Sequence, residues 1–203
     1  TAVSLEETGK IQIVALDKTG TITNGTPKVT DIVPADGISS DELLRLAFAL
    51  EVKSEHPLAK AIVEEGKCKG LDTALLQADN FTALVGNGLE GTVEGSHLLG
   101  GSVSFISGRV TISKADRQKA ALLAESGKTP LLFARDQKFL GIIAVADTIK
   151  EDSPKAIREL QNMGIRVVML TGDNERTARA IGAQAGVDEV IAGVLPEGKE
   201  QVI

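Results

Sequence analysis

The sequence predicts an α/β protein whose parallel-sheet domain is interrupted by an α+β insertion with an antiparallel sheet. Residues 11–16 form a short apolar run rich in β-branched side chains, which is typical of a buried parallel strand. Strand and helix patterns alternate after about residue 128, which favours more parallel strands covered by helices. Between them, helices are followed by short strands that glycine separates. We therefore expect a divided domain, residues 1–33 and 127–203, around an insertion at residues 34–126.

Local signals predict the elements before residue 127. An extended segment is expected at residues 28–33. Ser39, followed by two acidic residues, marks the start of a helix. Pro57 suits the first position of a second helix, which we expect to end near Gly66. Strands are expected at residues 81–85, 88–93, 97–99 and 102–106, and a further helix at residues 113–127.

After the insertion the pattern changes to apolar strands and helices. Strands are expected at residues 129–134, 139–146, 165–170 and 187–191, and helices at residues 153–163 and 174–184. We assign all of these elements to the α/β domain, because strand–helix alternation is typical of a parallel sheet.

Composition excludes several classes of function. Apolar residues make up 42% and charged residues 25% of the 203 residues, the balance of a globular domain. A net charge of −6 argues against a nucleic-acid partner. No run approaches the ~20 apolar residues that span a membrane, and the start lacks a signal-peptide pattern. Cys68 is the single cysteine, which excludes an internal disulfide and fits a reduced cytosolic setting.

Asp17 follows the first predicted strand, at the edge where open α/β sheets bind their ligands. A carboxylate there can attack phosphorus and form an aspartyl-phosphate. Lys18 offers positive charge to a phosphate, Thr19 offers a hydroxyl and a carbonyl, and Gly20 allows close approach of the backbone. An ordinary strand-to-loop turn is the alternative interpretation, because Asp and Gly are common in turns.

The longer string Asp17-Lys-Thr-Gly-Thr-Ile-Thr23 resembles the phosphorylation motif of P-type ATPases, which have a haloacid-dehalogenase-like catalytic core. The resemblance implies that Asp17, Lys18 and Thr19 are catalytic. It also implies that Asp17 and the backbone carbonyl of Thr19 bind Mg²⁺. On this basis the divided α/β domain is a phosphorylation domain, and the insertion is a nucleotide-binding domain.

Three further segments resemble motifs of the same family. Thr171 would hold a phosphoryl oxygen, with Gly172 and Asp173 beside the nucleotide, although Thr and Asp are also common helix N-caps. Lys199, at the end of Leu-Pro-Glu-Gly-Lys, would balance the charge of the aspartyl-phosphate. Asp147 falls where the family has an acid near the nucleotide ribose and the interdomain hinge, and a solvated turn is its alternative.

The string Ser54-Glu55-His56-Pro57 is the informative element of the insertion. A histidine before proline is usually a helix cap. Here Glu51 precedes the string, and Gly86 and Gly88 follow at a strand turn, where missing side chains could admit a purine. Glu51, Glu55, His56, Gly86 and Gly88 together resemble the nucleotide-binding domain of the heavy-metal subfamily. That subfamily lacks the usual aromatic residue for stacking adenine, in agreement with a chain that has no Trp or Tyr.

The resemblance also predicts what accompanies this chain. The sequence has no transmembrane segment and no Thr-Gly-Glu string, and it stops before the family's Gly-Asp-Gly-x-Asn-Asp segment. We therefore expect a truncated piece of a heavy-metal pump at the cytoplasmic face of a membrane. Its partners would be ATP, Mg²⁺ and the actuator and transmembrane domains of the same pump. Cu⁺ is the leading guess for the exported ion.

In such a pump, Asp17 would attack the γ-phosphate of MgATP after hinge closure. Two alternatives stay open. A soluble haloacid-dehalogenase-type phosphatase usually has a second Asp two residues after its nucleophile, where Thr19 stands here. A nucleotide-binding module without chemistry is the other alternative, and a phosphoenzyme assay with MgATP separates it from the pump.

Overall fold

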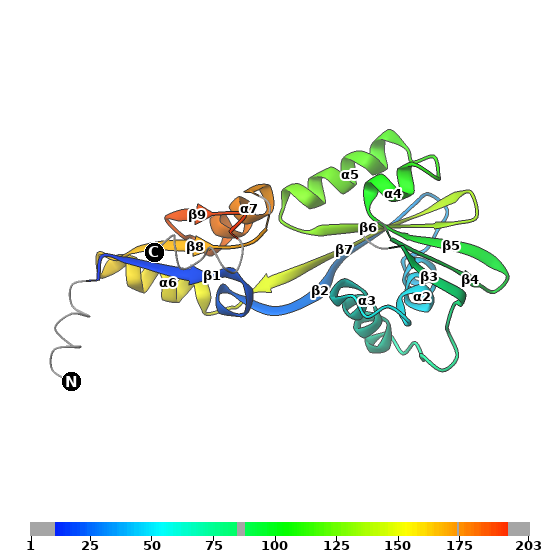
Figure 1. The fold of residues 1–203 in the computed structure, drawn as a ribbon, viewed down its shortest axis with the longest axis horizontal. Helices are drawn as coiled ribbons and strands as arrows, with labels where there is room; N and C mark the ends of the chain where they lie inside the picture. Colours follow the sequence, from blue (N-terminus) through cyan, green and yellow to red (C-terminus); the bar gives the residue numbers. More distant parts are fainter. Residues whose placement is uncertain (1–10, 85–87, 174, 195–203) are drawn as a thin grey trace. The chain divides into compact units, whose positions relative to one another are not determined.

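The structure, a computed structural model, describes residues 11–84, 88–173 and 175–194 (Figure 1). The chain divides into two compact units. We call them the parallel unit and the six-stranded unit, after their sheets. The parallel unit comprises Thr1–Gly25, Glu125–Gly127 and Asp147–Ile203, and the six-stranded unit comprises Thr26–Ala124 and Lys128–Ala146.

The parallel unit is built on a three-stranded sheet in the order β1-β8-β9. Both strand pairs are parallel, as predicted. The strands are β1 (Ile13–Asp17), β8 (Arg166–Leu170) and β9 (Glu189–Ile191), and the helices are α6 (Ser153–Asn162) and α7 (Glu175–Ala185). Side chains from both helices and from β8 form one buried apolar core, which includes Ile157, Met169 and Ile181.

β1 is less buried than its sequence predicts. The exposed fraction of Ile13 is 58%, whereas the apolar run predicted a buried strand. In the described part of the chain β1 pairs with β8 only, so it lies at an edge of the sheet. β-branched residues favour a strand at an edge as well as in the centre, and for this reason the run identified the strand but not its burial.

The six-stranded unit has an antiparallel sheet in the order β2-β7-β6-β5-β4-β3. Its strands are β2 (Thr23–Pro34), β3 (Asp79–Leu84), β4 (Gly88–Val93), β5 (Ser96–Gly101), β6 (Thr129–Arg135) and β7 (Lys138–Ile149). Its helices are α2 (Ser40–Glu51), α3 (Pro57–Cys68), α4 (Val103–Ser107) and α5 (Lys114–Glu125). The chain passes between the two units within β2 and β7. The first residues of β2, up to Gly25, and the last residues of β7, from Asp147, belong to the parallel unit.

The α2 helix forms where the sequence predicts it. The Ser39 side chain accepts a hydrogen bond from Glu42 N at 3.1 Å, which caps the first turn. The buried face of α2, with Leu43, Leu46 and Leu50, packs on β4 and β5, and α3 packs beside it. This packing places the end of α2 and the start of α3 next to the sheet.

Residues 102–106 were predicted as a strand, and this prediction is wrong. β5 ends at Gly101, and α4 follows at once. The Ser102 side chain accepts a hydrogen bond from Phe105 N at 3.2 Å, which starts a helical turn. The segment is short and apolar, and periodicity alone does not separate a strand from a buried helical turn of this length.

β6 and β7 lie in the antiparallel sheet, whereas the sequence analysis assigned residues 129–146 to the α/β domain. The polar turn between them was predicted correctly, and Asp136 adopts a positive φ of 55° there. β6 pairs with β5 on one side and with β7 on the other. A continuous apolar run such as residues 139–145 identifies a buried strand, but it contains no information about which sheet the strand joins.

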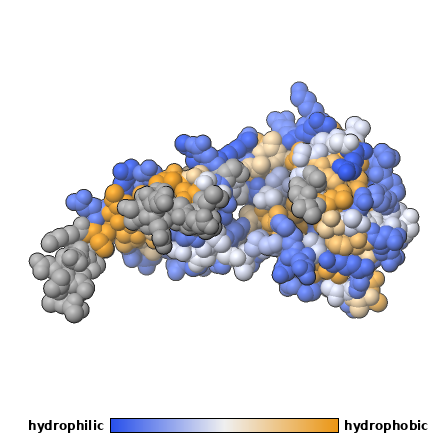
Figure 2. All heavy atoms as spheres, in the orientation of Figure 1, coloured by the Kyte–Doolittle hydropathy of each residue, from blue (hydrophilic) through white to orange (hydrophobic). Residues whose placement is uncertain are grey.

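Figure 2 shows hydrophilic residues in blue and apolar residues in orange, mixed over the face that it presents. Leu75 and Met163 are the most exposed large apolar side chains among the described residues. No helix in the described ranges is long and apolar enough to cross a membrane.

Candidate functional site

The carboxyl ends of β1 and β8 lie side by side. The two strands are parallel neighbours, and Asp17 is the register partner of Leu170. The segments that follow them, which begin at Lys18 and Thr171, therefore leave the sheet at the same edge. Ligands of open α/β sheets bind at this edge. The two motifs that sequence analysis identified separately are thus brought together.

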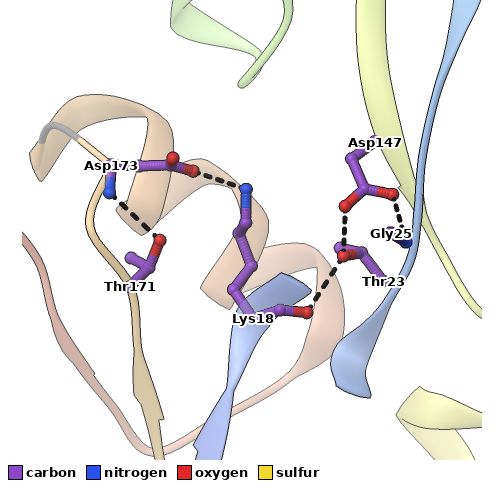
Figure 3. Close-up of polar contacts among 6 residues, drawn as sticks. All are labelled: Lys18, Thr23, Gly25, Asp147, Thr171 and Asp173. Carbon is purple, nitrogen blue, oxygen red and sulfur yellow. Dashed lines mark hydrogen bonds and ion pairs between the residues drawn. The ribbon is translucent and has the colours of Figure 1, made fainter. Parts of the chain in front are cut away.

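An ion pair joins these two segments (Figure 3). Lys18 Nζ lies 2.8 Å from Asp173 Oδ2, and the exposed fractions of the two side chains are 13% and 31%. Lys18 thus projects across the edge of the sheet toward the segment after β8. A cation held there is suited to bind an anion that enters the same edge, provided that the anion competes with Asp173.

Thr171 is buried and fixed on several sides. Its hydroxyl accepts a hydrogen bond from Asp173 N at 3.1 Å. Its backbone N–H donates to Ile191 O, and its carbonyl accepts from Val194 N. A hydroxyl that accepts one hydrogen bond keeps its own proton, which it can donate to a phosphoryl oxygen.

The backbone turns sharply directly after Asp17. Thr19 has φ −76° and ψ 120°, and Gly20 has φ 77° and ψ −12°, which are the angles of a type II turn. The second central position of that turn needs a positive φ, so glycine is the residue that suits it. We call residues Lys18–Ile22 the Asp17 loop.

Asp147 is engaged with the start of β2 (Figure 3). One carboxylate oxygen accepts from Gly25 N at 2.9 Å, and the other lies 2.5 Å from Thr23 Oγ1. Thr23 is fully buried, and its hydroxyl also lies 2.9 Å from the carbonyl oxygen of Lys18. Asp147, which the resemblance assigned to the ribose and the hinge, here fixes the exit of the Asp17 loop.

The oxygen donors around Asp17 fit Mg²⁺. This ion prefers oxygen ligands and is commonly bound by one or two carboxylates together with substrate phosphates. The Asp17 carboxylate and the Thr19 carbonyl are donors of this kind. Lys199, the remaining catalytic residue implied by the resemblance, lies outside the described residues.

A pocket of about 660 Å³ opens in the six-stranded unit. It is lined by Glu51, His56 and Gly88, three of the residues that the resemblance assigned to nucleotide binding. Glu55 is exposed and is not among the lining residues, and Gly86 lies outside the described residues. The pocket volume is in the range of small-molecule sites.

Glu51 presents a buried carboxyl group to this pocket. Its exposed fraction is 4%, and the described residues provide it with no side-chain hydrogen bond or ion pair. Burial raises the pKa of the Glu51 carboxyl to about 7. A carboxyl oxygen accepts hydrogen bonds, so a ligand with a hydrogen-bond donor is suited to this end of the pocket.

His56 caps α3 and also lines the pocket. Its Nδ1 accepts a hydrogen bond from Leu58 N at 3.2 Å, which satisfies an N–H of the first helical turn. Because Nδ1 accepts, the neutral ring carries its proton on Nε2. The cap thus fixes the ring while Nε2 and the ring face stay available, so the two interpretations of His56 are compatible.

Gly88 allows β4 to pack closely against Gly100 of β5 and Phe105 of α4. A Cβ at this position would lie 2.3 Å from the carbonyl oxygen of Gly100 and 2.8 Å from the Phe105 ring. The side chain is therefore excluded by β5 and α4. The expected reason for this glycine, space for a purine, differs from the packing that the structure shows.

Comparisons with known proteins show the family of this chain. The haloacid dehalogenase-like hydrolase family matches residues 11–203. The chain belongs to this family. Within the haloacid dehalogenase-like hydrolases, the resemblance to heavy-metal P-type ATPases that the motifs predicted is confirmed by the relatives described next.

Two curated relatives are named as copper transporters. The Copper-transporting ATPase 2 of Rhizobium meliloti (strain 1021) is 44% identical over 200 residues, or 98% of this chain. The Copper-exporting P-type ATPase of Staphylococcus saprophyticus subsp. saprophyticus is 44% identical over 195 residues, or 96% of this chain. The chain spans only 24% of the length of each of these relatives.

A solved structure extends the similarity to the fold. The crystal structure of a zinc-transporting PIB-type ATPase in the E2.Pi state superposes with a TM-score of 0.86 at 42% identity. The match covers 98% of this chain and 32% of that chain.

Sequence analysis missed part of the pocket of this haloacid dehalogenase-like chain. Gly100, Gly101, Ser102, Thr129 and Pro130 line it as well. The Gly100-Gly101 pair was a usable signal, because glycine inside a strand marks close approach of backbone or ligand. Thr129 and Pro130, on β6, offered no such signal in the sequence, because β6 was assigned to the other domain.

Proposed function

We propose that this chain is the ATP-binding and phosphorylation region of a heavy-metal-exporting P-type ATPase. The parallel unit would be its phosphorylation domain and the six-stranded unit its nucleotide-binding domain. The observation that carries the proposal is the meeting of two motif segments at one sheet edge, where Lys18 reaches Asp173 beside the end of β1. The curated relatives named as copper transporters support copper as the exported ion.

The reaction would start at the Asp17 carboxylate. One of its oxygens attacks the γ-phosphorus of ATP, the bond to the bridging oxygen breaks, and ADP leaves with that electron pair. Lys18, the Thr171 hydroxyl and Lys199 would hold the phosphoryl oxygens. Mg²⁺, held by Asp17 and the Thr19 carbonyl, would neutralise phosphate charge. Thr19 supplies no acid or base to hydrolyse the aspartyl-phosphate, which suits an intermediate that persists.

The pocket in the six-stranded unit would hold the adenosine part of ATP. The Glu51 carboxyl can accept a hydrogen bond from the exocyclic amine of adenine, and the His56 ring offers Nε2–H and a flat face. Apolar residues such as Leu84 and Leu131 supply contact with the base in a chain that has no Trp or Tyr. Asp147, Gly172 and Asp173 would act in the parallel unit, at the exit of the Asp17 loop and beside Lys18.

Whole-pump functions follow from the same proposal. Actuator and transmembrane domains of the same protein would be the partners of this region, on the cytoplasmic face of a membrane. The phosphorylation of Asp17 would drive the export of the metal ion.

The test is phosphate incorporation from MgATP labelled in the γ-phosphate. We expect an acid-stable, hydroxylamine-sensitive phosphoenzyme that Asp17→Asn abolishes, while nucleotide affinity stays within a few-fold. Asp36→Asn, at an exposed turn, is the matched control and should incorporate label as the unchanged protein does. ATP binding without incorporation would leave a nucleotide-binding module, and rapid phosphate release without ATP preference would indicate a phosphatase.

A further inference from the structure

The Asp17 loop is held from one side by the segment between β7 and α6. Lys150 Nζ donates to the carbonyl oxygen of Gly20 at 2.7 Å. The backbone N–H of Lys150 donates to Ile22 O at 3.0 Å, and the Ser153 hydroxyl donates to the same oxygen at 2.9 Å. The carbonyls of Gly20 and Ile22 are thus fixed by three donors that are distant from the loop in sequence.

Lys150 is committed to this contact. In the described part of the chain its ammonium has no carboxylate partner, so its bond to Gly20 is the interaction that the structure gives it. Hydrogen bonds from a charged donor are about twice as strong as neutral ones. The bond acts on the residue whose positive φ makes the type II turn, and it therefore restrains the orientation of the Gly20–Thr21 peptide group.

The positive charge of Lys150 lies close in sequence to the N-terminus of α6. α6 begins at Ser153, and its N-cap residue Asp152 makes no side-chain cap hydrogen bond. A cation close to a helix N-terminus is repelled by the helix dipole. The Lys150 ammonium therefore gains nothing from the helix dipole, whereas the Lys150 carbonyl accepts a hydrogen bond from Ser153 N at 3.2 Å.

We propose that Lys150 is a positioning residue for phosphoryl transfer to Asp17, because it holds the Gly20 carbonyl and with it the backbone of the Asp17 loop. This inference rests on the proposed function. None of the three hydrogen bonds from Lys150 and Ser153 uses the Thr19 carbonyl. The anchoring thus restrains the part of the loop that follows Thr19 and leaves the Thr19 carbonyl outside these three hydrogen bonds.

The experiment compares Lys150→Met, which removes the donor, with Lys150→Arg, which keeps a cationic donor. Lys155→Met is the matched control, because Lys155 is exposed on α6 and lies 3.9 Å from Glu159. The initial rate of phosphoenzyme formation is measured at several ATP concentrations in the full-length protein that contains this chain. These data give the maximal rate and the ATP concentration at which the rate is half-maximal. Calorimetric titration of ATP is measured in parallel.

We expect the rate at saturating ATP to fall about 10- to 100-fold in Lys150→Met, since small misplacements of a reacting group have effects of this size. The half-saturating ATP concentration and the calorimetric affinity should stay within about twofold. Lys150→Arg should recover most of the rate, and Lys155→Met should match the unchanged protein. An unchanged rate in Lys150→Met, or an equal loss in Lys150→Arg, would overturn the inference.

A second measurement keeps the two proposals separate. If the unchanged protein forms no phosphoenzyme, the proposed function fails, and amide hydrogen exchange in residues 17–23 then decides the role of Lys150. Exchange at least about tenfold faster in Lys150→Met than in Lys150→Arg supports the anchoring of the loop. Equal exchange in both variants would refute it.

Discussion

The ammonium group of Lys18 lies 2.8 Å from the carboxylate of Asp173, and this ion pair joins the ends of two parallel strands. Lys18 is thereby directed across the edge of the sheet before any anion is present. A phosphoryl group on Asp17 would compete with Asp173 for the same ammonium. The pair is therefore both a structural contact and a preset position for a phosphate-binding cation.

A double-mutant cycle on this pair should give a coupling of about 1 kcal/mol, because both side chains are only partly exposed. The variants are Lys18→Met, Asp173→Asn and the double substitution. The chain has no Trp or Tyr, so amide hydrogen exchange in β1 and β8 is the suitable measure of local stability. The coupling should shrink at about 1 M salt, where the Debye length is about 3 Å. Additive effects at low salt would contradict the prediction.

The buried Glu51 should make the stability of the six-stranded unit depend on pH. Burial raises its folded-state pKa to about 7 from 4.5, so between these values the folded chain holds a proton that the unfolded chain releases. The free energy of unfolding therefore contains a contribution from neutral Glu51 that is fully present below pH 4.5. This contribution is lost as the pH rises from 4.5 to about 7, and the loss is about 3 kcal/mol in total.

The measurement is chemical denaturation at pH 5 and pH 8 of the unchanged protein and of Glu51→Gln. Glutamine keeps the size of the side chain and does not titrate. We expect the unchanged protein to lose more stability than the variant between the two pH values. The difference between the two proteins isolates Glu51, because all other carboxyl groups titrate in both. Identical pH dependence would show that Glu51 is not the titrating group.

Much of the fold was predictable because its signals are local. Ser39 and Pro57 fixed the starts of α2 and α3, and β4 was predicted at its observed bounds. Gly20 was recognised as a position for close backbone approach, and the structure adds the positive φ of a type II turn. Such features depend on a few neighbouring residues, so the sequence contains them in full.

The rest depends on contacts between distant segments. The sheet that β6 and β7 join is determined by pairing with β5, and the apolar runs themselves do not specify a partner strand. The bond from Lys150 to Gly20 spans 130 positions, and no local pattern marks it. The meeting of Lys18 and Asp173 was accessible only because parallel strands end at one edge, a rule of topology and not of spacing.

His56 now allows a sharper test than a choice between cap and ligand. Its Nδ1 caps α3, and its ring lines the pocket. Asparagine is a good N-cap, so His56→Asn should keep the cap and remove the ring, whereas His56→Ala removes both. We expect both variants to lose about 1–2 kcal/mol of ATP binding, roughly five- to thirtyfold in Kd. Only His56→Ala should also lose about 1 kcal/mol of stability.

Calorimetric titration of ATP and thermal melts of each variant separate the two effects. Ser39→Ala is the matched control, because it removes the cap of α2, which Ser39 makes through Glu42 N, and Ser39 does not line the pocket. It should lower the melting temperature and leave the Kd for ATP unchanged. If His56→Asn binds ATP as tightly as the unchanged protein, the ring does not contact the nucleotide, and capping α3 is then the whole function of His56.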